Sequence, residues 1–142
     1  MKVMKIAQMI LRAAFVLVLI LGIGFWITPA LPAESPALKG VHMLLGIIVV
    51  LSLWTIGLAQ GFVKGGGNFG LAIGTFLVGL LVAIVGLWQE SWKGSAGMGT
   101  VELINTIHLL LGLIAIGFGE MVVARTKRLA KANANADVSV KA

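Results

Sequence analysis

The chain contains two histidines, and both stand in nearly the same sequence context. His42 lies in the segment VHMLLGI (41–47) and His108 in IHLLLGL (107–113), and a glycine follows each of them four residues later. An ionisable side chain in so apolar a segment is costly and therefore indicates a functional site. Neutral imidazole nitrogen is a good ligand for haem iron. The matching contexts make His42 and His108 candidate metal ligands of one site.

The elements that carry these histidines are predicted to cross a membrane. Of the 142 residues, 59% are hydrophobic and 11% are charged, and a soluble domain of this size could not bury that much apolar surface. The lipid bilayer is therefore a predicted partner of the chain. Four stretches lack Asp, Glu, Lys and Arg and are near or above the length needed to cross it. They are Ala13–Ala33, Val41–Val63, Gly65–Gln89 and Leu103–Gly119.

We expect an all-α fold, a transmembrane four-helix bundle. Its domain covers residues 1–128, with helices at about 5–27, 36–61, 69–90 and 100–128. Ser35 followed by Pro36 is typical of an N-cap with proline in the first helical position, and Thr100 can cap the last helix. Residues 129–142 lack apolar periodicity, which predicts a mobile cytoplasmic tail.

The two halves of the chain repeat one pattern. Gly24-Phe25-Trp26 closes the first predicted helix, and Gly86-Leu87-Trp88 closes the third. The histidine phrases follow sixteen and twenty residues after the two tryptophans. The pattern predicts two parallel-repeated helical hairpins that face each other.

The basic residues predict the orientation of the chain in the membrane. Nine of the eleven Lys and Arg residues fall in the N-terminal tail, the 61–68 loop or the C-terminal tail. The nine are Lys2, Lys5, Arg12, Lys64, Arg125, Lys127, Arg128, Lys131 and Lys141. By the positive-inside rule, both the N- and C-termini are cytoplasmic. We therefore expect a multi-pass protein of the plasma (inner) membrane of a prokaryote, with no nucleic acid as a partner.

The predicted helices bring the two histidines to a similar depth. Both helices that carry them run inward from the outer face, so His42 and His108 lie roughly 10 Å along their helices. Two imidazoles at one depth can ligate an iron from opposite sides. Gly46 and Gly112, one turn deeper, would leave room for a macrocycle, and Asn105 could hydrogen-bond a propionate or orient an imidazole. We therefore predict one haem b per chain.

Other interpretations of the histidines stay open. A membrane histidine can hydrogen-bond across helices, and glycine-rich faces can simply pack. A chlorophyll-type macrocycle is a further alternative, because magnesium needs only one axial imidazole. Zinc fits less well, since no carboxylate or thiolate accompanies the two histidines. The sequence has no cysteine, which excludes a thiolate-held iron–sulfur cluster and a covalently attached c-type haem.

The helix pattern, with one histidine on the second helix and one on the fourth, resembles that of membrane-embedded four-helix b-type cytochromes. It is similar to one half-module of the haem A synthase family, over the whole transmembrane region as a pattern of spacing. The resemblance implies that His42 and His108 are the two axial ligands of one haem. In that family an acidic residue linked to catalysis tends to precede the first histidine by one turn, whereas Lys39 stands here. Arginine often follows the histidine in the family, whereas Met43 and Leu109 follow here.

Glu120 is an acidic residue near the cytoplasmic end of the last predicted helix. It could relay protons or contact a quinone. Pairing with Arg125, Arg12 or Lys64, or simple snorkelling toward the interface, is the alternative interpretation.

The predicted function is electron relay through one bis-histidine haem near the outer membrane face. A quinone or a larger redox complex would be the partner, and oligomerisation is compatible with the pattern. No catalytic acid–base pair stands beside the histidines, which favours an electron-transfer protein over an enzyme. The alternatives are a cofactor-free helical subunit that scaffolds a larger membrane complex, and a haem-handling enzyme related to haem A synthase.

Overall fold

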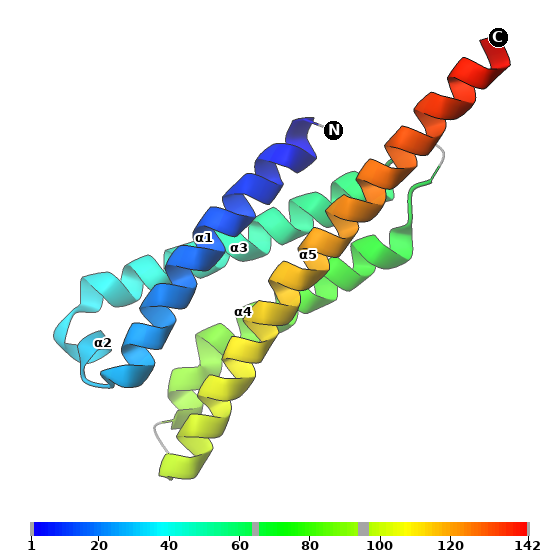
Figure 1. The fold of residues 1–142 in the computed structure, drawn as a ribbon. Coiled ribbons are helices and arrows are strands. Elements are labelled where there is room, and N and C mark those ends of the chain that lie inside the picture. Colours follow the sequence, from blue (N-terminus) through cyan, green and yellow to red (C-terminus); the bar gives the residue numbers. More distant parts are fainter. Residues whose placement is uncertain (1, 64–65, 94–96, 142) are drawn as a thin grey trace.

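A computed structural model describes residues 2–63, 66–93 and 97–141 of the chain. Within them lie five α-helices and no strand. The helices are α1 (Lys2–Ile27), α2 (Leu31–Glu34), α3 (Pro36–Gly61), α4 (Phe69–Lys93) and α5 (Met98–Lys141). Four of them, all except α2, are long and apolar enough to cross a bilayer. The expected all-α, four-helix transmembrane bundle is confirmed (Figure 1).

The apolar composition explains why the long segments are helical. No water is present in the hydrocarbon to satisfy backbone N–H and C=O groups, so a spanning segment must form its hydrogen bonds internally. Helices α1 and α3 have 26 residues each. That length corresponds to about 39 Å, which exceeds the hydrocarbon thickness of about 30 Å. Long helices fit such a layer by tilting, and the helices in Figure 1 cross at clear angles.

The observed helix boundaries agree with the prediction for α3 and differ elsewhere. Pro36 occupies the first turn of α3 as expected, although Ser35 at the N-cap position makes no side-chain capping bond. The predicted cap at Thr100 is wrong, because α5 already begins at Met98. Asn68 is a cap that the sequence did not single out: its Oδ1 accepts a hydrogen bond of 3.1 Å from the backbone N–H of Leu71.

Helix α5 continues well beyond the predicted end near residue 128. It runs to Lys141 and has 44 residues, so its C-terminal part extends past the other helices (Figure 1). The sequence after Arg128 is rich in alanine, which has the highest helix propensity and forms helix without an apolar face. The predicted mobility of residues 129–142 stays a prediction.

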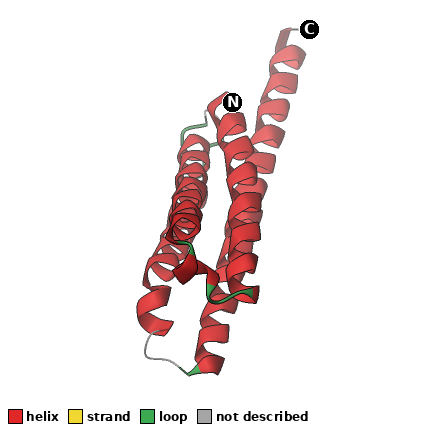
Figure 2. Ribbon diagram, turned by 90° about the vertical axis from the view of Figure 1, so that its left-hand side faces the viewer, coloured by secondary structure: helices red, strands yellow, loops and turns green. Residues whose placement is uncertain are grey.

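The short helix α2 interrupts the segment between α1 and α3, which the sequence predicted as a loop. It lies at the end of the bundle opposite the two termini, which both lie at the other end (Figures 1 and 2). We call the end that carries the termini the termini end.

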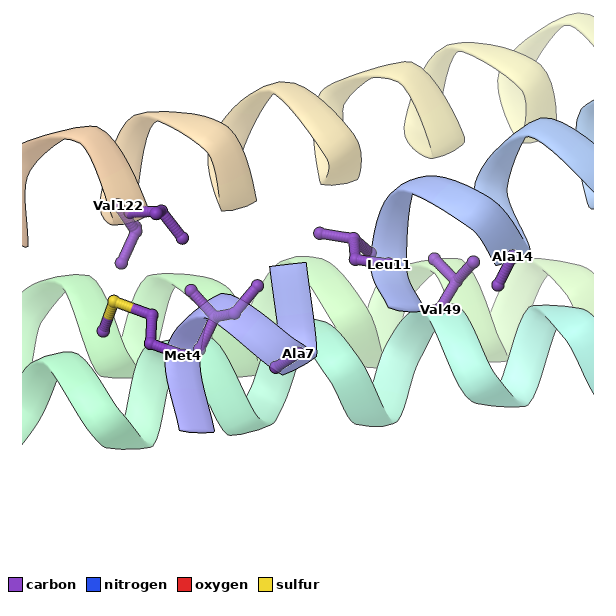
Figure 3. Packing of buried hydrophobic residues seen from close by; sticks show 8 residues of the cluster. Met4, Ala7, Leu11, Ala14, Val49 and Val122 are labelled. Atoms are coloured by element: carbon purple, nitrogen blue, oxygen red, sulfur yellow. The ribbon is translucent and has the colours of Figure 1, made fainter. Parts of the chain in front are cut away.

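A buried apolar core joins three of the long helices. Helix α1 contributes Met4, Ala7, Leu11 and Ala14, and α3 and α5 contribute Val49, Ile56, Val122 and Val123. Figure 3 shows several of these side chains in the space between the helices. Lipid is as apolar as these side chains, so close packing rather than escape from water holds such helices together.

Several glycines allow the close helix contacts of this core. A Cβ atom on Gly119 of α5 would lie 2.8 Å from a methyl group of Leu11 on α1. A Cβ on Gly57 of α3 would overlap the Thr75 side chain on α4. Small residues of this kind let transmembrane helices approach closely.

Candidate functional site

The structure brings the two histidines together. His42 lies on α3 and His108 on α5, and their ring centres are 6.4 Å apart with the ring planes at 52°. Both side chains are partly buried. Residues that are 66 positions apart in the sequence thus form one pair between two helices, where one ligand could contact both.

Each imidazole lies against a glycine of another helix. A Cβ atom built on Gly22 of α1 would lie 3.2 Å from Cε1 of His42. The corresponding distance from Gly86 of α4 to Cε1 of His108 is 3.1 Å. In both cases Nδ1 of the ring is 3.9 Å from the same position. Both Nδ1 atoms are also buried from solvent.

The sequence did not single out these two glycine contacts. The available signal was a glycine about 20 residues before each histidine, on a helix that runs in the opposite direction. Gly22 precedes His42 by 20 residues and Gly86 precedes His108 by 22.

The other predicted site residues lie next to the histidines along the same helices. Gly46 and Gly112 are partly buried, and neither is tightly packed. A Cβ on Gly46 would have no atom within 4 Å, and one on Gly112 would make an ordinary contact of 3.7 Å with Phe15. Asn105 is partly buried, one turn before His108. These positions differ clearly from the close-packed glycines of the core.

An aromatic ring flanks one of the two histidines. The ring centres of Phe25 on α1 and His42 are 5.4 Å apart, and the planes are tilted by 60°. Phe25 is three residues after Gly22 and therefore on the same side of α1. His42 thus lies beside both a glycine and an aromatic side chain of the same helix.

The described side chains in the half of the bundle around the histidines are partly buried or exposed. We call this half the histidine end; it comprises residues 15–27, 36–48, 83–93 and 98–114. Among the residues of this half whose burial is described, none is fully buried. The buried positions begin only at Ala14, Val49, Val82 and Ala115. The four helices therefore close tightly toward the termini end and leave partly buried side chains around the histidines.

The described residues include no group of three or more His, Cys, Asp or Glu side chains that could hold a metal ion. The imidazole pair alone offers two ligand nitrogens. A metal held here would therefore need further ligands from a bound group, as a porphyrin provides for its iron.

A second polar cluster joins α1 to α5 closer to the termini end. Both carboxylate oxygens of Glu120 accept hydrogen bonds from Arg12, from Nε and Nη2, each at 2.6 Å. Gln8 Nε2 donates to the same carboxylate at 2.7 Å, and Lys127 Nζ donates to Gln8 Oε1 at 3.2 Å. Of the interpretations open for Glu120, the structure supports pairing, with Arg12 as the partner. Twelve residues, or about 18 Å of helix, separate Glu120 from His108.

A third polar contact links α3 to α5. Thr126 donates a hydrogen bond to Gln60 Oε1, and both side chains are fully buried. The two residues are 66 positions apart, the same separation as between the two histidines.

Comparison of the chain with models of known protein families, with curated proteins and with solved structures finds no match.

Proposed function

We propose that this chain is an integral-membrane b-type haem protein that relays electrons through one haem, with His42 and His108 as the axial ligands. The observation that carries the proposal is the pair of imidazoles at 6.4 Å between α3 and α5. Haem and bis-histidine ligation are also what the resemblance to four-helix b-type cytochromes implies.

The separation of the rings fits ligation of one metal by both. A metal–nitrogen bond is about 2 Å long and the centre of an imidazole lies about 1 Å from its nitrogens, so two rings on opposite sides of one metal have centres roughly 6 Å apart. The observed 6.4 Å agrees with this distance.

The surroundings also fit a large flat group. Gly46 and Gly112 leave space where other residues would place a side chain, and no described residue of the histidine end is fully buried. Asn105, three residues before His108 and partly buried, could bind a propionate or orient an imidazole. The residues that would hold the haem are therefore His42 and His108, with Gly46, Gly112 and Asn105 beside them.

A bound haem would supply one-electron redox chemistry at this position. If His42 and His108 both bound its iron, the haem would be closed to substrate. Lys39 stands where the haem A synthase pattern has an acidic residue, which favours electron transfer over synthase activity. A quinone or a larger redox complex would exchange electrons with the chain, which could act as an oligomer.

The proposal includes two parallel-repeated hairpins, α1 with α3 and α4 with α5. Three observations support the repeat. His42 and His108 are 66 residues apart, and so are Gln60 and Thr126, which also meet between α3 and α5. In addition, each histidine lies against a glycine of the preceding long helix, with the same ring atoms nearest.

The proposed location is the plasma (inner) membrane of a prokaryote, with both termini cytoplasmic and the histidines near the outer face. The Lys and Arg distribution supports this orientation, because nine of the eleven fall in the tails or the 61–68 loop. That both termini lie at one end of the bundle agrees with it.

The decisive experiment is the absorption spectrum of the full chain, expressed with ample haem and purified in detergent. We expect the sharp reduced-state bands of a low-spin, six-coordinate b-type haem, with about one haem per chain. His42→Ala and His108→Ala should each remove the low-spin state, because the iron loses a strong-field ligand. Met43→Leu is the matched control: Met43 is next to a ligand but 43% exposed, and its substitution should leave the spectrum unchanged.

The same measurement separates the alternatives. A colourless wild-type protein would contradict the haem proposal and favour a cofactor-free subunit that scaffolds a larger membrane complex. A requirement for only one histidine would favour a single-ligand macrocycle of the chlorophyll type. A porphyrin that is chemically changed or released would favour a haem-handling enzyme.

A further inference from the structure

A side chain added to the glycine beside each imidazole would come too close to the imidazole ring. A Cβ atom at Gly22 or Gly86 would lie 3.2 or 3.1 Å from the Cε1 atom of its histidine, closer than most real Cβ contacts. The ring would have to move by a few tenths of an ångström to admit even a methyl group. Both imidazoles thus rest directly on the surface of another helix.

The contacts also show which atom of each ring faces the glycine. Cε1 and Nδ1 are the ring atoms within 4 Å of the Cβ position at Gly22, and the same two atoms are nearest at Gly86. Nε2 lies farther away in both rings. Cε1 is bonded to both ring nitrogens, so each ring points this carbon at its glycine, with Nδ1 and Nε2 on either side of it.

We propose that Gly22 and Gly86 are positioning residues, which leave His42 and His108 the space to keep the orientation in which both rings can bind one haem iron. This inference rests on the proposed haem function. A ligating ring is held by the metal on one side, so it cannot retreat from a side chain that grows toward it from the other. The requirement is for space, since glycine is otherwise unfavourable inside a helix.

The chain provides matched controls in the same helical setting. Gly24 follows Gly22 by two residues on α1, and a Cβ there would have no atom within 4 Å. Gly117 on α5 is exposed and is equally open. The same substitution at these positions makes the same chemical change without approaching an imidazole.

The test uses alanine and valine at Gly22 and Gly86, with Gly24→Val and Gly117→Val as controls, in the full chain. Three properties are measured: thermal unfolding, the imidazole ¹⁵N resonances of the protein before haem is added, and the haem spectrum. We expect Gly22→Ala to shift the resonances of His42 alone and Gly86→Ala those of His108 alone. Both valine variants should lose the low-spin haem state, whereas both controls should keep the wild-type resonances and spectrum.

The outcomes separate this inference from the proposed function. If wild type binds low-spin haem and Gly22→Val and Gly86→Val bind it equally well, the positioning role is wrong and the haem function stands. If wild type binds no haem, the proposed function fails, and the positioning role fails with it. Should the valine variants unfold, the alanine variants decide: resonances and spectrum identical to those of Gly24→Val would overturn the inference.

Discussion

At the scale of single residues, the glycines of the bundle fall into two groups with different consequences for substitution. Gly57 and Gly119 face side chains of neighbouring helices so closely that a Cβ atom cannot be added without displacement. Gly46 and Gly112 lie one turn from the histidines and accept a Cβ without a tight contact. Close helix packing therefore explains why Gly57 and Gly119 are glycines. It does not explain Gly46 and Gly112, whose open space fits the proposed cofactor.

This difference predicts opposite phenotypes. Gly46→Leu and Gly112→Leu should yield an inserted protein with near wild-type Tm that has lost or tilted its haem, because leucine fills the space beside the ligands. Gly57→Ala should instead lower the stability of the fold, by about 1–3 kcal/mol for an overpacked core, with an unchanged spectrum per folded molecule. Thermal unfolding and haem content per chain measure both effects. Loss of stability without loss of haem in the leucine variants would assign Gly46 and Gly112 to helix packing.

The histidine pair was readable from the sequence, but its glycine contacts were not. A repeated phrase around each histidine is a local signal. Contact between antiparallel helices depends instead on their rotation and register, which no short periodicity encodes. Aligning the two halves on Trp26 and Trp88 would have matched Gly86 with Gly24, whereas the structure places Gly22 beneath His42.

At the scale of helices, α1 and α5 are joined by charge, whereas α3 and α4 are joined by aromatic rings. Arg12 binds both oxygens of Glu120 across the first contact. Trp54 and Phe76 stack across the second, with ring centres 4.9 Å apart, and Trp54 Nε1 donates to the Phe76 carbonyl at 3.2 Å. A carboxylate in an apolar helix is stable only with a partner, so the fold depends on both members of the charged pair.

This pairing predicts a non-additive result. Arg12→Leu should lower the Tm, because it leaves the Glu120 carboxylate without its cationic partner. The double variant Arg12→Leu with Glu120→Leu should recover most of the loss, since apolar residues can replace an ion pair in a low-dielectric setting. Lys5→Leu, which removes an exposed basic residue from the same helix, is the control for charge alone. Equal Tm values for Arg12→Leu and Lys5→Leu would show that the ion pair does not support the α1–α5 contact.

The number of spanning helices and the limits of α3 followed from the sequence, because charge-free apolar runs leave the backbone no other structure in lipid. Two features did not follow. Helix α2 is a four-residue turn whose proline-rich sequence reads as a loop. Helix α5 ends later than predicted, because apolar periodicity stops near residue 128 while the alanine-rich sequence continues to favour helix.

At the scale of the whole molecule, both termini lie at one end of the bundle (Figures 1 and 2). We expect reporter fusions at Met1 and at Ala142 to be cytoplasmic, because the Lys and Arg residues favour that side by nine to two. Two reporters, one active only in the cytoplasm and one active only outside it, are fused to each terminus and show on which side of the membrane that terminus lies. External signals from both fusions would reverse the orientation and move the histidines to the inner face.

The restriction of the tight core to the termini end has a consequence for the order of assembly. Regions of a protein with few buried contacts open at lower free energy than its core. The termini end can therefore hold the four helices together before any cofactor arrives, and a ligand that binds this folded chain adds stability in proportion to the logarithm of its concentration. Folding of the chain and binding of the cofactor are then separate steps. A defect near Leu11 or Val122 would change whether the chain assembles, and a defect near the histidines would change what the assembled chain can take up.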